Sequence, residues 1–201
     1  QVLAPKGIWY TAVSGIWQTV WLEPVPDTHV AGLRLTPDVD SSSLGVEVHL
    51  EGAPAGIEVS ATALDGGRAV AAAAGPVEQP VKLAIPGARL WSPDEPHLYD
   101  LEIELCREGL VVDRVSSYFG LRKISLGKDG NGITRLMLNN KFVMQIGTLD
   151  QGFWPDGIYT APTDEALRYD IEMLKKMGYN MTRKHVKVEP DRWYYWADKL
   201  G

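Results

Sequence analysis

The hydrophobic pattern changes its period once along the chain, and this change constrains the fold more than any other feature. Before residues 127–132, which read Gly-Lys-Asp-Gly-Asn-Gly, short segments alternate apolar and polar residues. After them, apolar residues recur every three to four positions, the spacing of one helix face. Clustered glycines with Asp-Gly and Asn-Gly pairs are typical of turns. The sequence therefore predicts a β domain followed by an α/β segment, with the boundary in this glycine-rich stretch.

The β domain is predicted from segments that alternate in polarity. The clearest runs from Tyr99 to Leu105, where every second residue is apolar and the residues between are acidic. This period of two places the apolar set on one face of a sheet. Three further segments share this character: Leu44 to Gly52, Gly56 to Leu64 and Pro80 to Ile85. Strands at intervals of about 8–12 residues, separated by Pro, Gly and Asp, predict an antiparallel sandwich from about Val30 to Leu126.

The α/β segment is predicted to run strand, helix, strand, helix. Phe142 to Ile146 is a short apolar strand of the kind that parallel sheets bury on both faces. Thr163 is suited to cap a helix that ends near Gly178, and Tyr179 to Val186 forms the second strand. Pro190 suits the first position of the last helix. The apolar positions of the two helices are Leu167, Ile171 and Leu174, then Trp193, Trp196, Ala197 and Leu200.

Both ends of the sequence contain segments that lack partners. Two parallel strands with two helices leave strand edges and apolar faces uncovered. Ile8 to Tyr10 and Ile16 to Leu22 are strand-like, with no strands before them. We therefore expect this chain to be part of a longer protein, with the first segments forming the last strands of a preceding β domain.

Composition excludes several classes of function. The chain has 201 residues, with 20 Lys and Arg against 26 Asp and Glu, so its formal net charge is −6. Without a basic cluster it is not expected to bind nucleic acid. Cys106 is the single cysteine, which excludes an internal disulfide and a thiolate zinc cluster. No apolar run approaches the roughly 20 residues of a membrane span, so no membrane partner is expected. The compartment stays open.

Four segments, in this order, resemble the landmarks of family-2 glycoside hydrolases, the group of β-galactosidases, β-glucuronidases and β-mannosidases. They are GIWQTVWLEPVP (Gly15 to Pro26), LWSPDEPHLYDLEIEL (Leu90 to Leu105), SYFGLRKI (Ser117 to Ile124) and LNNKFVMQIGTLDQG (Leu138 to Gly152). The resemblance covers essentially the whole chain. It implies a fold that is mainly β with α/β. Residues 1–26 would be the last strands of a jelly-roll domain, 27–126 an immunoglobulin-like β-sandwich, and 133–201 the first two βα units of a TIM (β/α)₈ barrel.

The resemblance implies that the parent protein is a retaining β-glycosidase, an O-glycosyl hydrolase that acts on carbohydrate. Such enzymes use two carboxylates about 5–5.5 Å apart, as acid/base and nucleophile. In the family both glutamates lie on later barrel strands, so this chain would contain no catalytic residue and would be inactive alone. We interpret Asp150 and Asp156 as loop carboxylates, and Glu189 and Asp191 as residues that begin a helix. No cofactor and no metal site are expected, and a homo-oligomer is compatible with the sequence.

Five residues are predicted to bind substrate: Asp150, Gln151, Trp154, Arg183 and His185. The first three come after the first predicted strand, and Arg183 and His185 lie in the end region of the second; barrel active sites form where strands end. The resemblance implies a second-strand arginine and a following histidine, which Arg183 matches and His185 matches only loosely because the spacing differs. The first-strand loop lacks the histidine that the family usually carries.

Other roles for these residues remain open. Arg183 could pair with a carboxylate inside the barrel, His185 could be a hydrogen-bonded strand residue, and Trp154 could pack on a neighbouring domain. The alternative function is a non-catalytic carbohydrate-binding or adhesion module built on the sandwich, since a fold does not fix a function.

Overall fold

The structure is a computed structural model that describes residues 2–7 and 9–201. The chain forms two compact units. The larger contains Glu23–Met144, and the smaller combines Gln1–Leu22 with Gln145–Leu200. We describe each unit by itself. Within the described ranges, no helix has both the length and the apolar character needed to cross a membrane.

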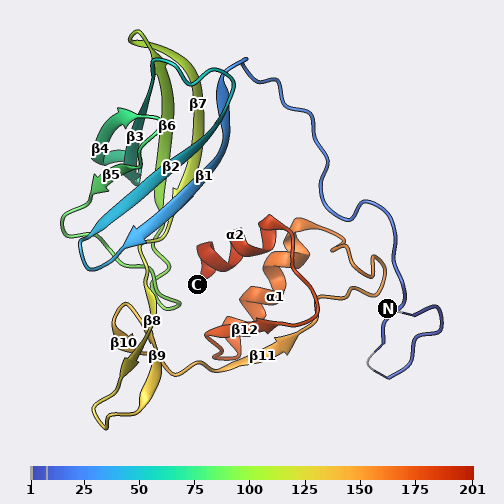
Figure 1. The fold of residues 1–201 in the computed structure, drawn as a ribbon. Coiled ribbons are helices and arrows are strands. Elements are labelled where there is room, and N and C mark those ends of the chain that lie inside the picture. The colour runs from blue at the N-terminus through green and yellow to red at the C-terminus, as the bar shows by residue number, and fades with distance from the viewer. Residues whose placement is uncertain (1, 8) are drawn as a thin grey trace. The chain divides into compact units, whose positions relative to one another are not determined.

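The larger unit contains a sandwich of two antiparallel sheets (Figure 1). The strands of the first sheet, in spatial order, are β1 (His29–Asp38), β2 (Ser43–Glu51) and β5 (Val81–Ala84). Those of the second are β4 (Arg68–Pro76), β3 (Ile57–Asp65), β6 (Tyr99–Arg107) and β7 (Leu110–Phe119). All four segments predicted from alternating polarity contain strands of this sandwich, which confirms the mainly β fold predicted from period two.

The core of the sandwich lies between the two sheets and uses one face of each strand. In β6, Tyr99, Leu101, Ile103 and Leu105 are buried. The other sheet contributes Leu44, Val46, Val81 and Leu83 to the same cluster. Burying each such aliphatic side chain stabilises a fold by about 1.5–3 kcal/mol.

Two-residue hairpins fix the register of neighbouring strands. Gly66 and Gly67 connect β3 to β4 with φ of 57° and 80°. Asn139 and Asn140, with φ of 52° and 64°, connect the paired residues Leu138 and Lys141 in the same way. Positive φ at both central residues is the geometry of a type I′ turn, whose twist matches that of the strands.

A third sheet of the larger unit follows the sandwich strands in sequence. It contains β8 (Ile124–Lys128), β9 (Thr134–Leu138) and β10 (Lys141–Phe142), all antiparallel. Asn139 anchors it, because its Oδ1 accepts from the Lys123 backbone N–H at 3.0 Å and its Nδ2 donates to the Trp91 carbonyl at 3.0 Å. This sheet spans the stretch in which we placed the domain boundary. The limits 27–126 and 133–201 stay predictions.

The smaller unit has the predicted order of strand, helix, strand, helix. Its elements are β11 (Gly147–Asp150), α1 (Asp164–Lys176), β12 (Met181–Lys184) and α2 (Asp191–Leu200), and the two strands are parallel. The N-cap prediction is confirmed, since Thr163 Oγ1 accepts from the Ala166 backbone N–H at 3.1 Å. The helices pack together through Leu167, Ile171 and Trp193, with Trp196, Ala197 and Leu200 around them.

The prediction of a strand from Phe142 to Ile146 was wrong. Phe142 pairs with Met137 in the small antiparallel sheet, whereas the parallel pairing with β12 begins beside Ile146, whose carbonyl accepts from the Asn180 backbone N–H at 3.0 Å. The two ends of this apolar run therefore pair in two different sheets, and residues 143–146 connect these sheets. The second predicted strand is also shorter than expected, since β12 ends at Lys184 and Val186 has a φ of 59°.

The first segment of the chain differs from its predicted form. Between Val2 and Thr28, the described residues form isolated bridges, such as Lys6 with Trp9. None of these described residues belongs to an extended strand. Ile8 lies outside the described residues. Ile16 to Leu22 was predicted as a strand, and that prediction was wrong for this chain. A strand needs a neighbour to satisfy its backbone groups, and most of this segment is exposed.

Candidate functional site

The candidate site lies at the carboxyl ends of β11 and β12, where the two strands present different residues on their two faces. Asp150 pairs in register with Lys184, and Leu149 with Arg183. Successive side chains of a strand point to opposite faces. Asp150 and Lys184 are half-buried, and the Lys184 ammonium lies 4.4 Å from the ring centroid of Trp193 in α2. Leu149 and Arg183 are exposed, so Arg183 points to the face opposite the helices.

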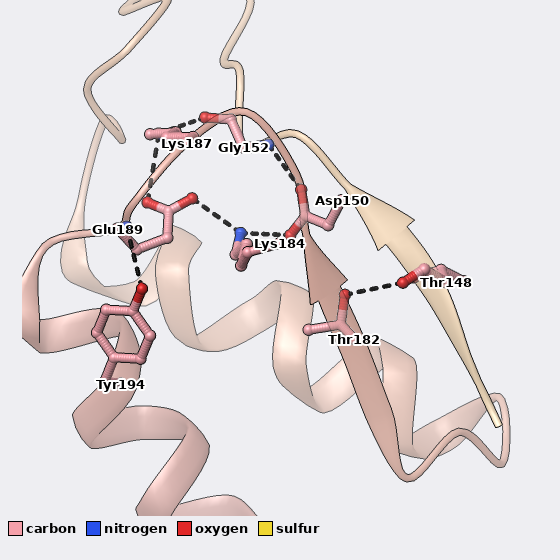
Figure 2. A network of polar contacts seen from close by, with 8 residues as sticks. All are labelled: Thr148, Asp150, Gly152, Thr182, Lys184, Lys187, Glu189 and Tyr194. Carbon is pink, nitrogen blue, oxygen red and sulfur yellow. Dashed lines mark hydrogen bonds and ion pairs between the residues drawn. The ribbon is translucent and has the colours of Figure 1, made fainter. Parts of the chain in front are cut away.

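A network of ions connects the loops that follow the two strands (Figure 2). Lys184 Nζ contacts Asp150 Oδ2 and lies 2.8 Å from Glu189 Oε1. Lys187 Nζ lies 3.3 Å from Glu189 Oε2 and donates to the Gly152 carbonyl. Glu189 therefore bridges two lysines, and through them it joins the loop after β12 to the end of β11.

The network is almost completely withdrawn from solvent at its centre. The side chains of Lys187 and Glu189 are 0% and 2% exposed. Burial lowers the pKa of Lys187, while the Glu189 carboxylate acts in the opposite direction. Partial desolvation raises the pKa of Asp170 in α1, and the charges of Asp150 and Glu189 add to that rise. Each buried ion here depends on its partner, because an unpaired buried charge is strongly destabilising.

Gln151 and His185 are brought together beside this network. Gln151 Nε2 lies 3.1 Å from His185 Nδ1, and the His185 backbone N–H donates to the Asp150 carbonyl at 2.9 Å. Gly152, which follows Gln151, has a φ of 65° and donates its backbone N–H to Asp150 Oδ1 at 2.7 Å. These bonds fix the direction in which the first loop leaves its strand.

The surroundings of Trp154 and Arg183 differ from those of that pair. Trp154 is half-buried and packs against the cluster of Leu167, Ile171 and Trp193. Its backbone N–H donates to the Ile158 carbonyl at 2.8 Å, and the Ile158 N–H donates back at 3.0 Å. Arg183 is on the exposed face, which the smaller unit leaves open. The substrate roles of all five residues stay predictions.

Three residues of the network were missed as site residues: Lys184, Lys187 and Glu189. Glu189 was interpreted as a residue that begins a helix, but α2 starts at Asp191 and Glu189 is a buried ion partner before it. Asp191 does lie in the first turn of α2, as predicted. The signal in the sequence was the placement of Lys187 and Glu189 next to Val186 and Val188, directly after Lys184 and His185. In the part of the chain that the structure describes, no group of three or more His, Cys, Asp or Glu could hold a metal ion.

We next compared the sequence and the fold of this chain with those of known proteins. A sandwich followed by a parallel βα arrangement is a multidomain architecture of α and β parts, and residues 28–122 match the family model of glycosyl hydrolases family 2. Over these residues the chain is similar to this family.

Relatives match well beyond the sandwich. A β-galactosidase of Lactococcus lactis subsp. lactis is 25% identical over 94% of this chain and 18% of its own length. A putative β-glucuronidase of Formosa agariphila is 29% identical over 93% of this chain and 23% of its own length. The chain thus spans about a fifth of the length of these relatives.

Solved structures share the fold. A family-2 glycosyl hydrolase from Bacteroides cellulosilyticus superimposes with a TM-score of 0.80 at 21% identity, over 96% of this chain and 26% of that one. At this identity the likeness concerns the fold alone.

Proposed function

We propose that this chain is part of a retaining β-glycosidase that hydrolyses O-glycosidic bonds of carbohydrates. The observation that carries the proposal is the order β11, α1, β12, α2, which comes later in the chain than a sandwich that matches the family. The relatives that align with nearly the whole chain are named β-galactosidase and β-glucuronidase. The sugar and the linkage are not part of the proposal.

We assign the smaller unit's βα elements to the first two units of a (β/α)₈ barrel. Two parallel strands with a helix between them are the repeating element of that fold. The exposed face that carries Leu149 and Arg183 would then line the barrel interior, and α1 and α2 would form part of its outer ring. The sandwich at 27–126 would be immunoglobulin-like, and residues 1–26 would be the C-terminal part of a jelly-roll domain.

The proposed mechanism needs two carboxylates that face each other across the scissile bond. The carboxylates near this site are engaged otherwise, since Asp150 contacts Lys184 and Glu189 holds two lysines. Asp156 lies in an exposed loop, where its Oδ1 accepts from the Gly157 N–H at 3.0 Å. We therefore propose that both catalytic carboxylates lie outside this chain and that the chain alone is inactive.

The contribution of this chain is proposed to be one wall of the sugar site. Arg183, on the exposed face, would place a permanent positive charge beside the nucleophile. Gln151 and His185 would donate and accept hydrogen bonds with sugar hydroxyls at the strand ends. Asp150 would act mainly through Lys184, and Trp154 would support the first loop from the core.

The alternative, a non-catalytic binding or adhesion module, is not favoured. A module built on the sandwich alone would not account for the parallel βα elements after it, and the matched relatives are named as glycosidases.

The test compares this 201-residue chain with the parent protein. We expect the parent to hydrolyse at least one of the 4-nitrophenyl β-galactoside, β-glucuronide and β-mannoside with retention of configuration, followed by NMR. The chain alone should hydrolyse none. A parent inactive on every β-glycoside, or a chain active alone, would contradict the proposal.

A further inference from the structure

The smaller unit contains a cavity that none of the five predicted site residues lines. Its volume is about 710 Å³, within the range of roughly 300–1,000 Å³ typical of small-molecule sites. Three separate stretches surround it: residues 16–21, the loop into α1 with its first turn, and the start of α2. A site built from three stretches can surround a ligand on several sides.

Aromatic side chains form one part of the wall. Trp17, Trp21 and Tyr159 all line the cavity. Trp17 meets Tyr159 edge to face, with ring centroids 4.8 Å apart at 84°. Tyr159 is held from other sides by Phe153, at 5.7 Å between centroids, and by the Lys187 ammonium, 4.7 Å from its ring. Tyr159 is thus fixed in place, and Trp21 is 71% exposed and accessible to a ligand.

Polar and charged groups form the rest of the wall. Asp164 begins α1 and Asp191 begins α2, and Arg192 Nη1 lies 3.8 Å from Asp164 Oδ1. Carboxylates accept hydrogen bonds and guanidinium groups donate them, whereas a sugar hydroxyl does both. The lining carries two carboxylates and one guanidinium, which disfavours an anionic ligand. Flat aromatic faces beside such groups suit a neutral ring with apolar C–H faces and hydroxyl edges.

We propose that this cavity binds a neutral pyranose ring of an oligosaccharide. The choice of a saccharide rests on the proposed function, whereas the choice of a neutral ring rests on the charges of the wall. Trp21 stacks on the ring, and Arg192 and Asp164 bind its hydroxyls.

The test uses the 201-residue chain, ¹⁵N-labelled, with lactose as the neutral probe. The seven tryptophans give indole N–H signals, which single Trp→Phe variants assign. We expect the Trp17 and Trp21 signals to shift saturably, with a Kd in the millimolar range, about −4 kcal/mol at 1 mM. Trp21→Ala should raise the Kd at least tenfold, and Arg192→Ala should raise it severalfold.

Controls separate specific binding from other effects. Trp9→Ala removes another exposed tryptophan of the same segment that does not line the cavity, so it should leave the Kd unchanged. Sorbitol, which has hydroxyls but no ring, should cause no saturable shift, and methyl β-glucuronide should bind more weakly than lactose.

The proposal is overturned if lactose causes no saturable shift up to about 50 mM, or if both Trp21→Ala and Arg192→Ala bind as the unchanged chain does. An active parent with an empty cavity would refute this proposal alone. Binding here with an inactive parent would refute the proposed function alone.

Discussion

Replacing Glu189 by Gln should destabilise the smaller unit strongly. Glu189 is 2% exposed and is the shared partner of Lys184, at 2.8 Å, and of Lys187, at 3.3 Å. Gln keeps the size of the side chain and one acceptor oxygen, but it removes the charge that balances two buried or half-buried ammonium groups. Removal of one partner of a buried ion pair typically costs about 3–5 kcal/mol. We expect about 3 kcal/mol, because Asp150 still contacts Lys184 and Lys187 can lose its proton.

The pH dependence of this variant follows from Lys187. Burial already lowers the pKa of Lys187, and loss of the Glu189 carboxylate removes the charge that opposes this effect. Between the lowered folded pKa and the ordinary unfolded pKa, the unfolded chain binds more protons than the folded one. Stability therefore rises with pH in this window. The deficit of Glu189→Gln should shrink as the pH is raised from neutral towards the ordinary lysine pKa.

The measurement is amide hydrogen exchange in the intact chain, because two units can open separately and one global unfolding curve would mix them. Exchange of the most protected amides of β12 and α2 should accelerate on the order of 10²-fold at neutral pH, since about 1.4 kcal/mol corresponds to tenfold. Glu172→Gln is the matched control, since its partner Arg168 lies one helical turn away in a partly exposed pair, worth about 0.5 kcal/mol. Equal effects of the two variants would refute the reasoning.

Three other changes test different parts of the molecule. Gly152→Ala should lower the protection of β12 amides by at least tenfold, because its Cβ would lie 2.1 Å from Glu189 Oε1 at a φ of 65°; Gly130→Ala, in open space, is the control for hydrogen exchange. Leu101→Ala should lower the free energy of unfolding of the sandwich by about 2–5 kcal/mol, measured from the exchange of its most protected amides, since Leu101 is fully buried. Exchange in α1 should stay unchanged. Arg183→Ala in the parent should lower kcat/KM on the order of 10²-fold with an unchanged Tm. Arg183→Lys should recover little of the lost kcat/KM, because an ammonium lacks the planar fork of a guanidinium. A lowered Tm with near-normal kinetics would make Arg183 a packing residue.

The sandwich was predictable because its signal is local. In Tyr99 to Leu105 the period of two alone assigns four side chains to the core, and all four are buried. The two helices were predictable for the same reason, from a capping threonine and an apolar stripe. The strand at Phe142 to Ile146 was not, because an apolar run does not say which of two sheets will pair with it. Phe142 and Gly147 pair with partners on opposite sides in sequence, Met137 and Met181.

The candidate site was predictable only in position. Strand ends were identified, and with them Gln151 and His185, which the structure places 3.1 Å apart. The ion network was missed because its contacts join Asp150 to Lys184, 34 residues later, and the sequence gives no sign of which carboxylate a buried lysine meets. Charged residues in an apolar segment indicate burial with a partner, but the partner appears only when two strands align in register.

The alternation of β12 explains why one strand can serve both stability and the proposed chemistry. Lys184 faces the helices, where Asp150, Glu189 and the ring of Trp193 surround its ammonium. Arg183, one residue earlier, faces the other way and is exposed. Neighbouring side chains on a strand point to opposite faces. The carboxylates that pair with Lys184 therefore lie on the face opposite Arg183. A shift of the register by one residue would exchange these positions, burying Arg183 among the helices and exposing Lys184, so the pairing of Asp150 with Lys184 also fixes the face on which Arg183 stands.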